Sequence, residues 1–311
     1  MNELEIIEII RKMFEVREYP LTDDVAYLPN GWAYKVDMLV KSTDVPEGMN
    51  GFQVGRKSVA AVLSDLSTKG VKPIFMMLSF AFQTGITNAY ITEILNGIKQ
   101  MASKYKMVLV GGDVNKANDT VIDCIIAGKY KKKVLRSGAR IGDSVYVAGD
   151  FGLTTIGLDY LLNKKPIVNE KLKSYALKAV YEPDPPVNFN IEVINTGYVS
   201  ASMDSSDGLA YTLNEIAQQS NVKIVINNFP MSEEIKKLIE SEGRDPLNDS
   251  LYGGEEYQMV FTFNQEKDFL LNKLAKKHNV KVFKIGKVEN GNGVFLTNGK
   301  KIEKKGWVFN F

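Results

Sequence analysis

The segment Met107-Val108-Leu109-Val110-Gly111-Gly112-Asp113 decides the fold class, because in it a short apolar strand runs straight into two glycines and a carboxylate. A second apolar stretch, Thr120 to Ala127, follows after only a few residues, with no helix between the two strands. Elsewhere the apolar residues recur at helical spacing, as they do from Arg56 to Lys69. Strands and helices thus mix without the regular alternation of a doubly wound sheet, which predicts an α+β fold.

The same two periodicities predict further elements on both sides of this segment. Helices are expected over residues 4–14, 92–105, 153–162 and 235–242, and directly after Asp207-Gly208. Strands are expected over residues 32–40, 76–82, 144–148, 222–226 and 259–263. Near the end, Asn298-Gly299 between two short apolar runs, 293–297 and 301–303, indicates a hairpin.

The length of the chain predicts two domains. Its 311 residues compare with about 100–200 residues in an ordinary domain. A basic run, Lys129 to Lys133, precedes Ser137-Gly138, which is typical of a joint between domains. We therefore expect an N-terminal domain over residues 1–137 and a C-terminal domain over residues 138–311.

Composition excludes several kinds of chemistry. With 1 His and 1 Cys, the chain has almost no material for a Ser-His-Asp triad or a zinc site of several Cys and His ligands. The 39 Lys and Arg nearly balance 37 Asp and Glu, so no global field favours nucleic acid or a membrane surface. The longest apolar stretch, Val71 to Phe82, contains Lys72 and Pro73 and is shorter than the roughly 20 residues that span a bilayer. We expect a soluble, cytoplasmic protein with a buried Cys124.

Six short segments place a carboxylate after an apolar run. An Asp in such a position is more often a helix cap or a turn residue than a ligand. Taken together, however, their apolar neighbours would draw the carboxylates into the interior, where unpaired charges repel and are costly to desolvate. Because the segments themselves carry few basic residues, hard divalent cations such as Mg²⁺ are the better candidates to offset this charge. The segments are Thr22-Asp23-Asp24-Val-Ala, Val36-Asp37-Met-Leu-Val, Leu63-Ser64-Asp65-Leu, Gly111-Gly112-Asp113, Met203-Asp204-Ser-Ser206-Asp207-Gly208-Leu209 and Gly253-Gly254-Glu255-Glu256-Tyr257.

Glycines in three of these segments would let backbone N–H groups approach phosphate oxygens closely. The chain nevertheless lacks a Gly-x-x-x-x-Gly-Lys-Ser/Thr loop. Gly149-Asp-Phe-Gly152 also stands without the other signatures of a protein kinase. Both of these ATP-binding classes are therefore disfavoured.

The order of these motifs resembles the thiamine-monophosphate kinase family, within the superfamily of aminoimidazole ribonucleotide synthetase-like enzymes. The resemblance covers essentially the whole chain. It implies two α+β domains: an N-terminal one over residues 1–137 that binds ATP and metal and forms a homodimer, and an α/β C-terminal one over residues 138–311 that completes the active site. The activity that it implies is ATP- and Mg²⁺-dependent phosphorylation of thiamine monophosphate to thiamine diphosphate. The carriers are Asp23-Asp24-Val-Ala, Val36-Asp37-Met-Leu-Val, Gly55-Arg56-Lys57-Ser-Val-Ala60 with Ser64-Asp65-Leu66, Val110-Gly-Gly-Asp113, Arg136-Ser-Gly-Ala-Arg140-Ile-Gly-Asp143, Asp204-Ser-Ser-Asp-Gly-Leu209 and Gly253-Gly-Glu-Glu-Tyr257.

The resemblance also implies site residues. The magnesium positions are Asp24, Asp37, Asp65, Asp113, Asp204 and Asp207. The ATP-contacting positions are Gly112, Asp113, Arg136 and Ser206. Substrate contacts are expected at Glu255, at Asp44 and at Phe311, for which core packing is an equal alternative. Asp44 departs from the family, since many relatives have a histidine there, and an anion at this position would attract a cationic thiazolium or else signal a different substrate.

The expected chemistry needs no catalytic general base. A phosphate monoester has a second pKa near 6, so its oxygen is largely deprotonated at neutral pH. The difficulty is electrostatic, and phosphoryl transfer is mostly positioning and charge stabilisation. No catalytic side chain is therefore expected beyond the metal ligands.

Three alternatives remain at the level of sequence. One is another enzyme of the superfamily; a purine-pathway synthetase shares the Mg-ATP logic, whereas selenophosphate synthetases and the hydrogenase-maturation dehydratase use a Cys that this chain lacks at the corresponding place. A second is a nucleotide- or metal-binding relative without turnover. The third treats the acidic segments as Ca²⁺ sites that only stabilise the fold.

Overall fold

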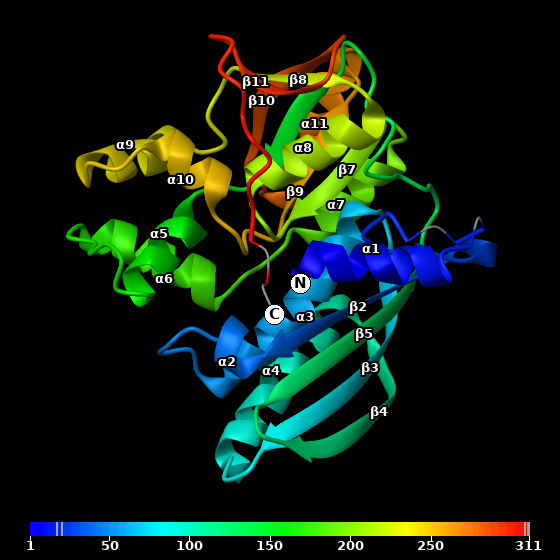
Figure 1. The fold of residues 1–311 in the computed structure, drawn as a ribbon, viewed down its shortest axis with the longest axis vertical. Helices are drawn as coiled ribbons and strands as arrows, with labels where there is room; N and C mark the ends of the chain where they lie inside the picture. The colour runs from blue at the N-terminus through cyan, green and yellow to red at the C-terminus, as the bar shows by residue number, and fades with distance from the viewer. Residues whose placement is uncertain (17, 20, 308, 310–311) are drawn as a thin grey trace.

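The computed structural model describes residues 1–16, 18, 19, 21–307 and 309, and contains two sheets (Figure 1). The N-terminal sheet has the strand order β1-β2-β5-β3-β4. β3 and β4 are parallel, and the other neighbouring pairs are antiparallel. The strands are β1 (Ala26–Tyr27), β2 (Trp32–Val40), β3 (Lys72–Gln83), β4 (Val108–Ala117) and β5 (Val121–Lys129).

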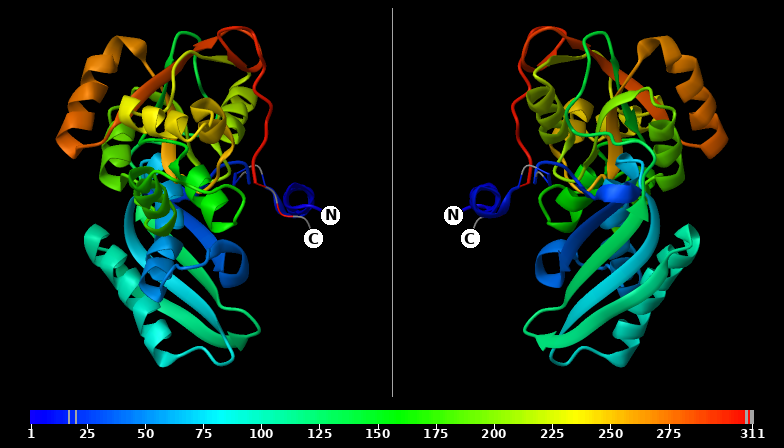
Figure 2. Two further views of the ribbon diagram at one scale, coloured as in Figure 1. Left: turned by 90° about the vertical axis from the view of Figure 1, so that its left-hand side faces the viewer. Right: turned by 90° about the vertical axis from the view of Figure 1, so that its right-hand side faces the viewer.

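Two long helices, α3 (Gly51–Thr68) and α4 (Asn88–Tyr105), pack on this sheet and on each other (Figure 2). α3 begins with a capping box in which the Asn50 side chain accepts from the N–H of Gln53. Glycine is needed where the helices cross, because a Cβ at Gly55 would lie 2.0 Å from the carbonyl oxygen of Ile94. This close packing buries most of α3 and fixes the side chains on its surface.

The other face of the N-terminal sheet carries apolar side chains that this chain leaves exposed. Side chains alternate along a strand, so residues paired across neighbouring strands share a face. The exposed apolar residues of this open face range from 37% to 61% accessible; they are Val36, Met38, Phe75, Met77 and Val108.

The C-terminal sheet has the strand order β11-β8-β10-β6-β9-β7 and is mostly antiparallel, with β11 parallel to β8. Its strands are β6 (Ser144–Ala148), β7 (Val199–Ser205), β8 (Lys223–Ile226), β9 (Gln258–Phe263), β10 (Val282–Glu289) and β11 (Gly293–Leu296). Two apolar clusters, one including α8 (Leu209–Ser220) and the other α7 (Val187–Asn195) with α11 (Asp268–His278), form its core.

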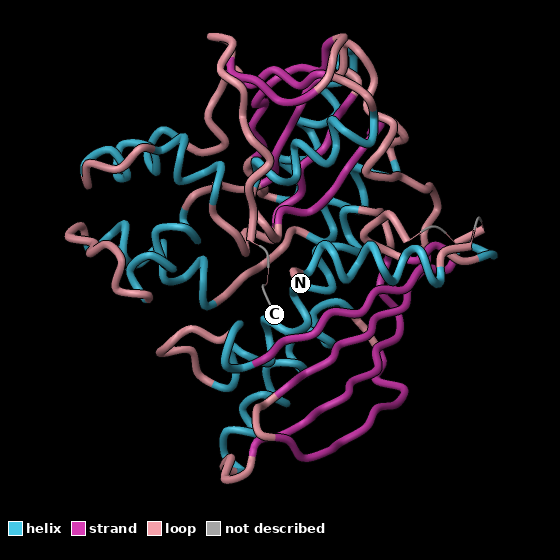
Figure 3. Tube along the Cα trace, in the orientation of Figure 1, coloured by secondary structure: helices cyan, strands magenta, loops and turns pink. Residues whose placement is uncertain are grey.

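Four further helices form a smaller unit beside this sheet (Figure 3). They are α5 (Leu153–Leu161), α6 (Glu170–Tyr181), α9 (Glu233–Ser241) and α10 (Pro246–Tyr252). α5, α6 and α9 share an apolar cluster that includes Ile156, Leu172 and Ile235. The remaining helices are α1 (Glu3–Phe14), the one-turn α2 (Lys41–Asp44) and two 3-10 turns, Pro29–Gly31 and Gln265–Lys267.

The predicted α+β class is confirmed, and most predicted elements form within a few residues of their expected ends. One prediction about the deciding segment is wrong, because Gly111-Gly112-Asp113 does not end a strand but lies inside β4. The predicted hairpin forms as a short one: Phe295 and Lys301 make an antiparallel bridge, the N–H of Leu296 donates to the Lys300 carbonyl, and the N–H of Ile302 donates to the Val294 carbonyl. The predicted boundary between residues 137 and 138 stays a prediction.

α1 forms where the sequence predicts an amphipathic helix, yet none of its residues is buried. The N-terminal cap helps α1 to form without burial, since Asn2 and Glu5 make a capping box. The N–H of Glu3 donates to the carbonyl of Phe309, which brings the two ends of the chain together. Across the described residues, no helix is both long and apolar enough to cross a membrane.

Candidate functional site

Three buried aspartates meet where the two halves of the chain touch. Asp24, Asp65 and Asp204 each offer a carboxylate oxygen within 4.8 Å of the others. They come from the segment before β1, from α3 and from β7. Their carboxylate oxygens are the hard donors that Mg²⁺ and Ca²⁺ prefer. These three residues, called the acidic cluster below, fit a divalent cation.

The elements that carry the acidic cluster are tied together directly. β7 is an edge strand whose Asp204 pairs with Met259 of β9. The hydroxyl of Ser64 on α3 donates to Asp204 Oδ2 at 2.7 Å. Because this bond joins α3 of the N-terminal half to β7 of the C-terminal half, the cluster exists only when the two halves are packed together.

Two basic side chains neutralise Asp24. Lys69, fully buried at the end of α3, lies 2.8 Å from Asp24 Oδ2 and 2.7 Å from Asp23 Oδ1. Arg136 Nε donates to Asp24 Oδ1 at 2.7 Å. Burial favours the neutral acid, but Lys69 and Arg136 outweigh it and lower the pKa of Asp24 to about 2. Asp24 is therefore ionised before any metal binds.

The other two carboxylates of the cluster lack this degree of compensation. Burial, followed by the charge of Asp204, raises the pKa of Asp65 well above its ordinary value. Burial, followed by the charge of Asp24, raises the pKa of Asp204. Asp207 is close enough to respond as well, since burial and then Asp204 raise its pKa to about 6. A cation entering here would relieve repulsion between carboxylates.

Lys35 connects Asp37 to the edge of the acidic cluster, and it lies outside the motifs that the sequence singles out. Lys35 precedes it by two positions on β2, so both side chains point toward α3. Lys35 Nζ lies 2.9 Å from Asp65 Oδ2 and 3.3 Å from Asp37 Oδ1. The sequence favours divalent cations over Lys and Arg for offsetting these carboxylates, and that preference stays a prediction; Lys35, Lys69 and Arg136 supply part of the positive charge.

A second group surrounds Glu255. Lys57, only 2% exposed, donates to Glu255 Oε1 at 2.5 Å and to the carbonyl oxygen of Asp44 at 2.7 Å. The N–H groups of Glu255 and Tyr257 donate to the carbonyls of Ser206 and Ser205, so this loop lies along the end of β7. Glu255 and Tyr257 both have positive φ, a strained conformation that is frequent at functional sites.

Asp44 does not present a free carboxylate. Its Oδ2 accepts from the N–H of Val40 at 2.7 Å and so closes the turn of α2. The pKa of the half-buried Tyr257 is raised, first by its partial burial and then by the charges of Glu255, Asp37 and Asp44, so Tyr257 lies among these acids. Asp44 is thus placed near Glu255, but its side chain already has a structural partner.

Gly112 and Asp113 are not brought to the acidic cluster within one chain. Gly112 lies in the same cross-strand row as Asp37, three strand spacings or about 14 Å away. Asp113 pairs with Ser79 in the row of Met38, so it points toward the open face. The fold itself requires glycine at position 112, because a Cβ there would lie 2.1 Å from the Leu78 carbonyl oxygen.

Two predicted site residues remain, Ser206 and Phe311. Ser206 follows β7 beside Asp207, and its hydroxyl lies 3.3 Å from Asp207 Oδ2. Phe311 lies outside the described residues. The roles predicted for Asp24, Asp37, Asp65, Asp113, Asp204, Asp207, Gly112, Arg136, Ser206, Asp44 and Glu255 stay predictions.

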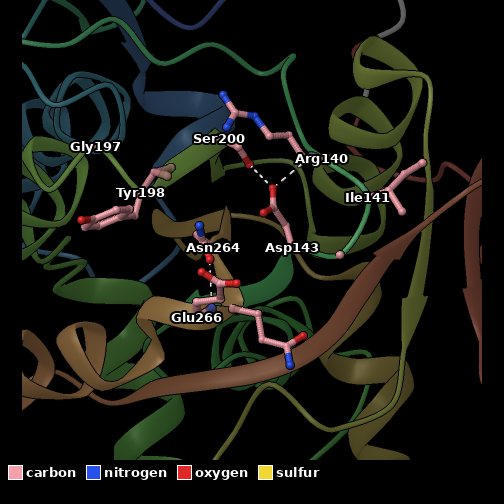
Figure 4. A pocket seen from close by; sticks show the side chains of 11 residues that line it. Arg140, Ile141, Asp143, Gly197, Tyr198, Ser200, Asn264 and Glu266 are labelled. Atoms are coloured by element: carbon pink, nitrogen blue, oxygen red, sulfur yellow. Dashed lines mark hydrogen bonds between the residues drawn. The ribbon is translucent and has the colours of Figure 1, made fainter.

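Two cavities lie elsewhere. One, of about 590 Å³, is lined by Arg140, Asp143, Tyr198 and Ser200 (Figure 4). The Asp143 carboxylate in it accepts hydrogen bonds from the Ser200 hydroxyl and from the N–H of Arg140. Another of about 360 Å³ borders Glu256, which accepts from the Gly152 N–H at 2.6 Å. Burial raises the pKa of Glu256 to about 7. Neither cavity is lined by the acidic cluster.

Comparison with known proteins identifies the class to which this fold and site belong. Residues 22–130 match the model of the N-terminal domain of AIR synthase related proteins. Residues 140–298 match the model of their C-terminal domain. The chain is therefore an AIR synthase related protein.

Full-length relatives identify the family within this class. The thiamine-monophosphate kinase of Nitrosopumilus maritimus is 36% identical, over 99% of this chain and 98% of its own. The thiamine-monophosphate kinase of Pyrococcus abyssi is 33% identical, over 98% of this chain and 93% of its own. The solved structure of AaThiL complexed with AMPPCP and TMP has a TM-score of 0.87 and 30% identity, covering 99% of this chain and 97% of that one. The chain belongs to the thiamine-monophosphate kinase family.

Proposed function

We propose that this protein phosphorylates thiamine monophosphate to thiamine diphosphate with ATP, by direct in-line transfer of the terminal phosphoryl group. The observation that carries the proposal is the likeness, over nearly the whole chain, to a structure complexed with AMPPCP and TMP. The acidic cluster at the contact between the two halves supports it, because phosphoryl transfer between two anions needs concentrated positive charge.

Magnesium would bind at the acidic cluster, with Asp37 and Asp207 at its edges and Asp113 as a further ligand. Bound Mg²⁺ supplies charge neutralisation and holds phosphate oxygens in position. Lys69 and Arg136 keep Asp24 ionised, so one ligand is ready at neutral pH. Ser64 holds Asp204 toward α3 and thereby sets the spacing between Asp204 and Asp65.

The acceptor phosphate needs no general base from the chain. Its second pKa is near 6, so at pH 7 to 8 the attacking oxygen is already deprotonated. We assign Gly112, Asp113, Arg136 and Ser206 to ATP, and Glu255, with Asp44 and Phe311, to the thiamine phosphate. Lys57 fixes one carboxylate oxygen of Glu255, which supports a defined orientation of that side chain toward substrate.

A homodimer is part of the proposal. The open face of the N-terminal sheet exposes Val36, Met38, Phe75, Met77 and Val108, and a second copy of the chain would bury them. Asp113 points to that same face, so dimerisation would bring it beside residues of the other copy. We also place the protein in the cytoplasm, since its substrates are those of central metabolism.

The test is product analysis with purified protein, MgCl₂, ATP and thiamine monophosphate. We expect equal amounts of ADP and thiamine diphosphate, and turnover lowered about 100-fold or more with Asp204→Asn. Lys104→Met, which removes the ammonium of an exposed ion pair with Asp184, is the matched control and should retain activity. Absence of thiamine diphosphate at every Mg²⁺ concentration would remove the proposal and favour a relative without turnover.

A further inference from the structure

Lys35 is a half-buried cation that no step of the proposed reaction uses. It lies on β2 with Asp37, paired with Ile126 of β5, and its side chain points to the α3 face. Its side chain is 22% exposed, so the aliphatic stem is packed and the ammonium is held at the carboxylates. Nζ contacts both Asp65 and Asp37.

We propose that Lys35 is a built-in cation that occupies the space between Asp37 and Asp65, so that no metal ion binds between these two residues in the nucleotide-free protein. The inference rests on the proposed function only in taking the acidic cluster to be the metal site. It makes Lys35 a residue that sets how many ions the site holds and where they bind.

Geometry supports mutual exclusion of the ammonium and a metal ion. Asp65 and Asp37 would offer hard carboxylate oxygens to a shared Mg²⁺ ion. Lys35 Nζ already lies 2.9 Å from Asp65 Oδ2 and 3.3 Å from Asp37 Oδ1, so the ammonium occupies the position between the two carboxylates that such an ion would need. The ammonium and the metal ion would also repel each other, because both carry positive charge.

The other basic residues of the site do not duplicate this role. Lys69 and Arg136 contact Asp23 and Asp24, and Lys57 contacts Glu255. Among the residues that the structure describes, Lys35 is the only Lys or Arg whose side-chain nitrogen lies within 4.0 Å of a carboxylate oxygen of Asp37 or Asp65. Its removal therefore leaves those two carboxylates without a paired cation.

The test counts ions without asking for activity. Mn²⁺, which shares the oxygen preference of Mg²⁺, is titrated into nucleotide-free protein, and free ion is measured by electron paramagnetic resonance. We expect Lys35→Met to bind one ion more per chain than the wild type, or to bind its ions at least tenfold more tightly. Lys35→Arg, which keeps the charge, and Lys104→Met should both match the wild type.

An unchanged ion count in Lys35→Met, with binding less than tenfold tighter than in the wild type, overturns the inference. If that variant does not fold by circular dichroism, Asp37→Asn decides. The inference expects Asp37→Asn to bind as many ions as the wild type, and the loss of one ion overturns it. Because Mn²⁺ binding is measured without substrates, failure of thiamine monophosphate phosphorylation leaves this result unaffected.

Discussion

Replacing Lys69 by Met is expected to destabilise the protein strongly. The ammonium is fully buried, lies 2.7 Å and 2.8 Å from Asp23 and Asp24, and donates to the Ser202 carbonyl at 2.5 Å. Removing one partner of a buried ion pair costs about 3–5 kcal/mol, because the remaining charge is left uncompensated. Arg136 still contacts Asp24, so the lower end of this range is the better expectation.

This loss of free energy predicts a measurable change in melting temperature. The entropy of unfolding is about 2 cal/mol/K per residue, so 3–5 kcal/mol corresponds to about 5–8 °C for cooperative unfolding of a chain of this size. Differential scanning calorimetry in EDTA measures the change without bound metal. Lys104→Met, which breaks an exposed ion pair, should shift the melting temperature by less than about 2 °C. A Lys69→Met protein that melts with the wild type would refute the reasoning about buried charge.

Three further predictions concern the cluster, a buried acid and the open face. Asp204→Asn should lower turnover about 100-fold or more in a product assay while melting in EDTA at an equal or higher temperature, because its repulsion with Asp24 is removed. The pKa of Glu256 is raised to about 7, so the folded protein binds this proton more tightly than the unfolded chain, and stability falls as pH rises from about 4.5 through 7. Glu256→Gln, whose side-chain oxygen still accepts from Gly152, should therefore raise the free energy of unfolding at pH 8, by at most about 3 kcal/mol in urea titrations; a decrease at pH 8 contradicts this sign. Met38→Asp should halve the mass seen by light scattering, and a monomeric wild type would end the dimer proposal.

Local patterns in the sequence were sufficient for most elements. The apolar stripe from Arg56 to Lys69 predicts the buried helix α3, and the uninterrupted apolar run at residues 144–148 is β6. β10 was missed because Lys284, Gly286 and Lys287 interrupt its alternation of apolar and polar residues. The strand forms because it is hydrogen-bonded to β6 on one side and to β8 on the other. α1 shows the opposite case, a clear amphipathic pattern with no buried face.

The sequence singles out the acids of the candidate site and one of its bases, Arg136, but not Lys35 or Lys69. Asp24, Asp65 and Asp204 lie in motifs that the sequence singles out, and the structure brings them together. Lys35 and Lys69 have no such motif, since their partners come from other strands and loops. A signal did exist for Lys35, because alternation along a strand places it on the same face as Asp37. The direction of Asp113 depends on the register of four strands, which local sequence does not encode.

In the proposed reaction, a phosphoryl group passes from ATP directly to the phosphate of thiamine monophosphate. Incubation with ATP labelled at the terminal phosphate, followed by chromatographic separation of the thiamine phosphates, tests it most directly. We predict that the label appears in the terminal phosphate of thiamine diphosphate at one equivalent per ADP formed. Label recovered only as inorganic phosphate, with thiamine monophosphate unchanged, would contradict the account.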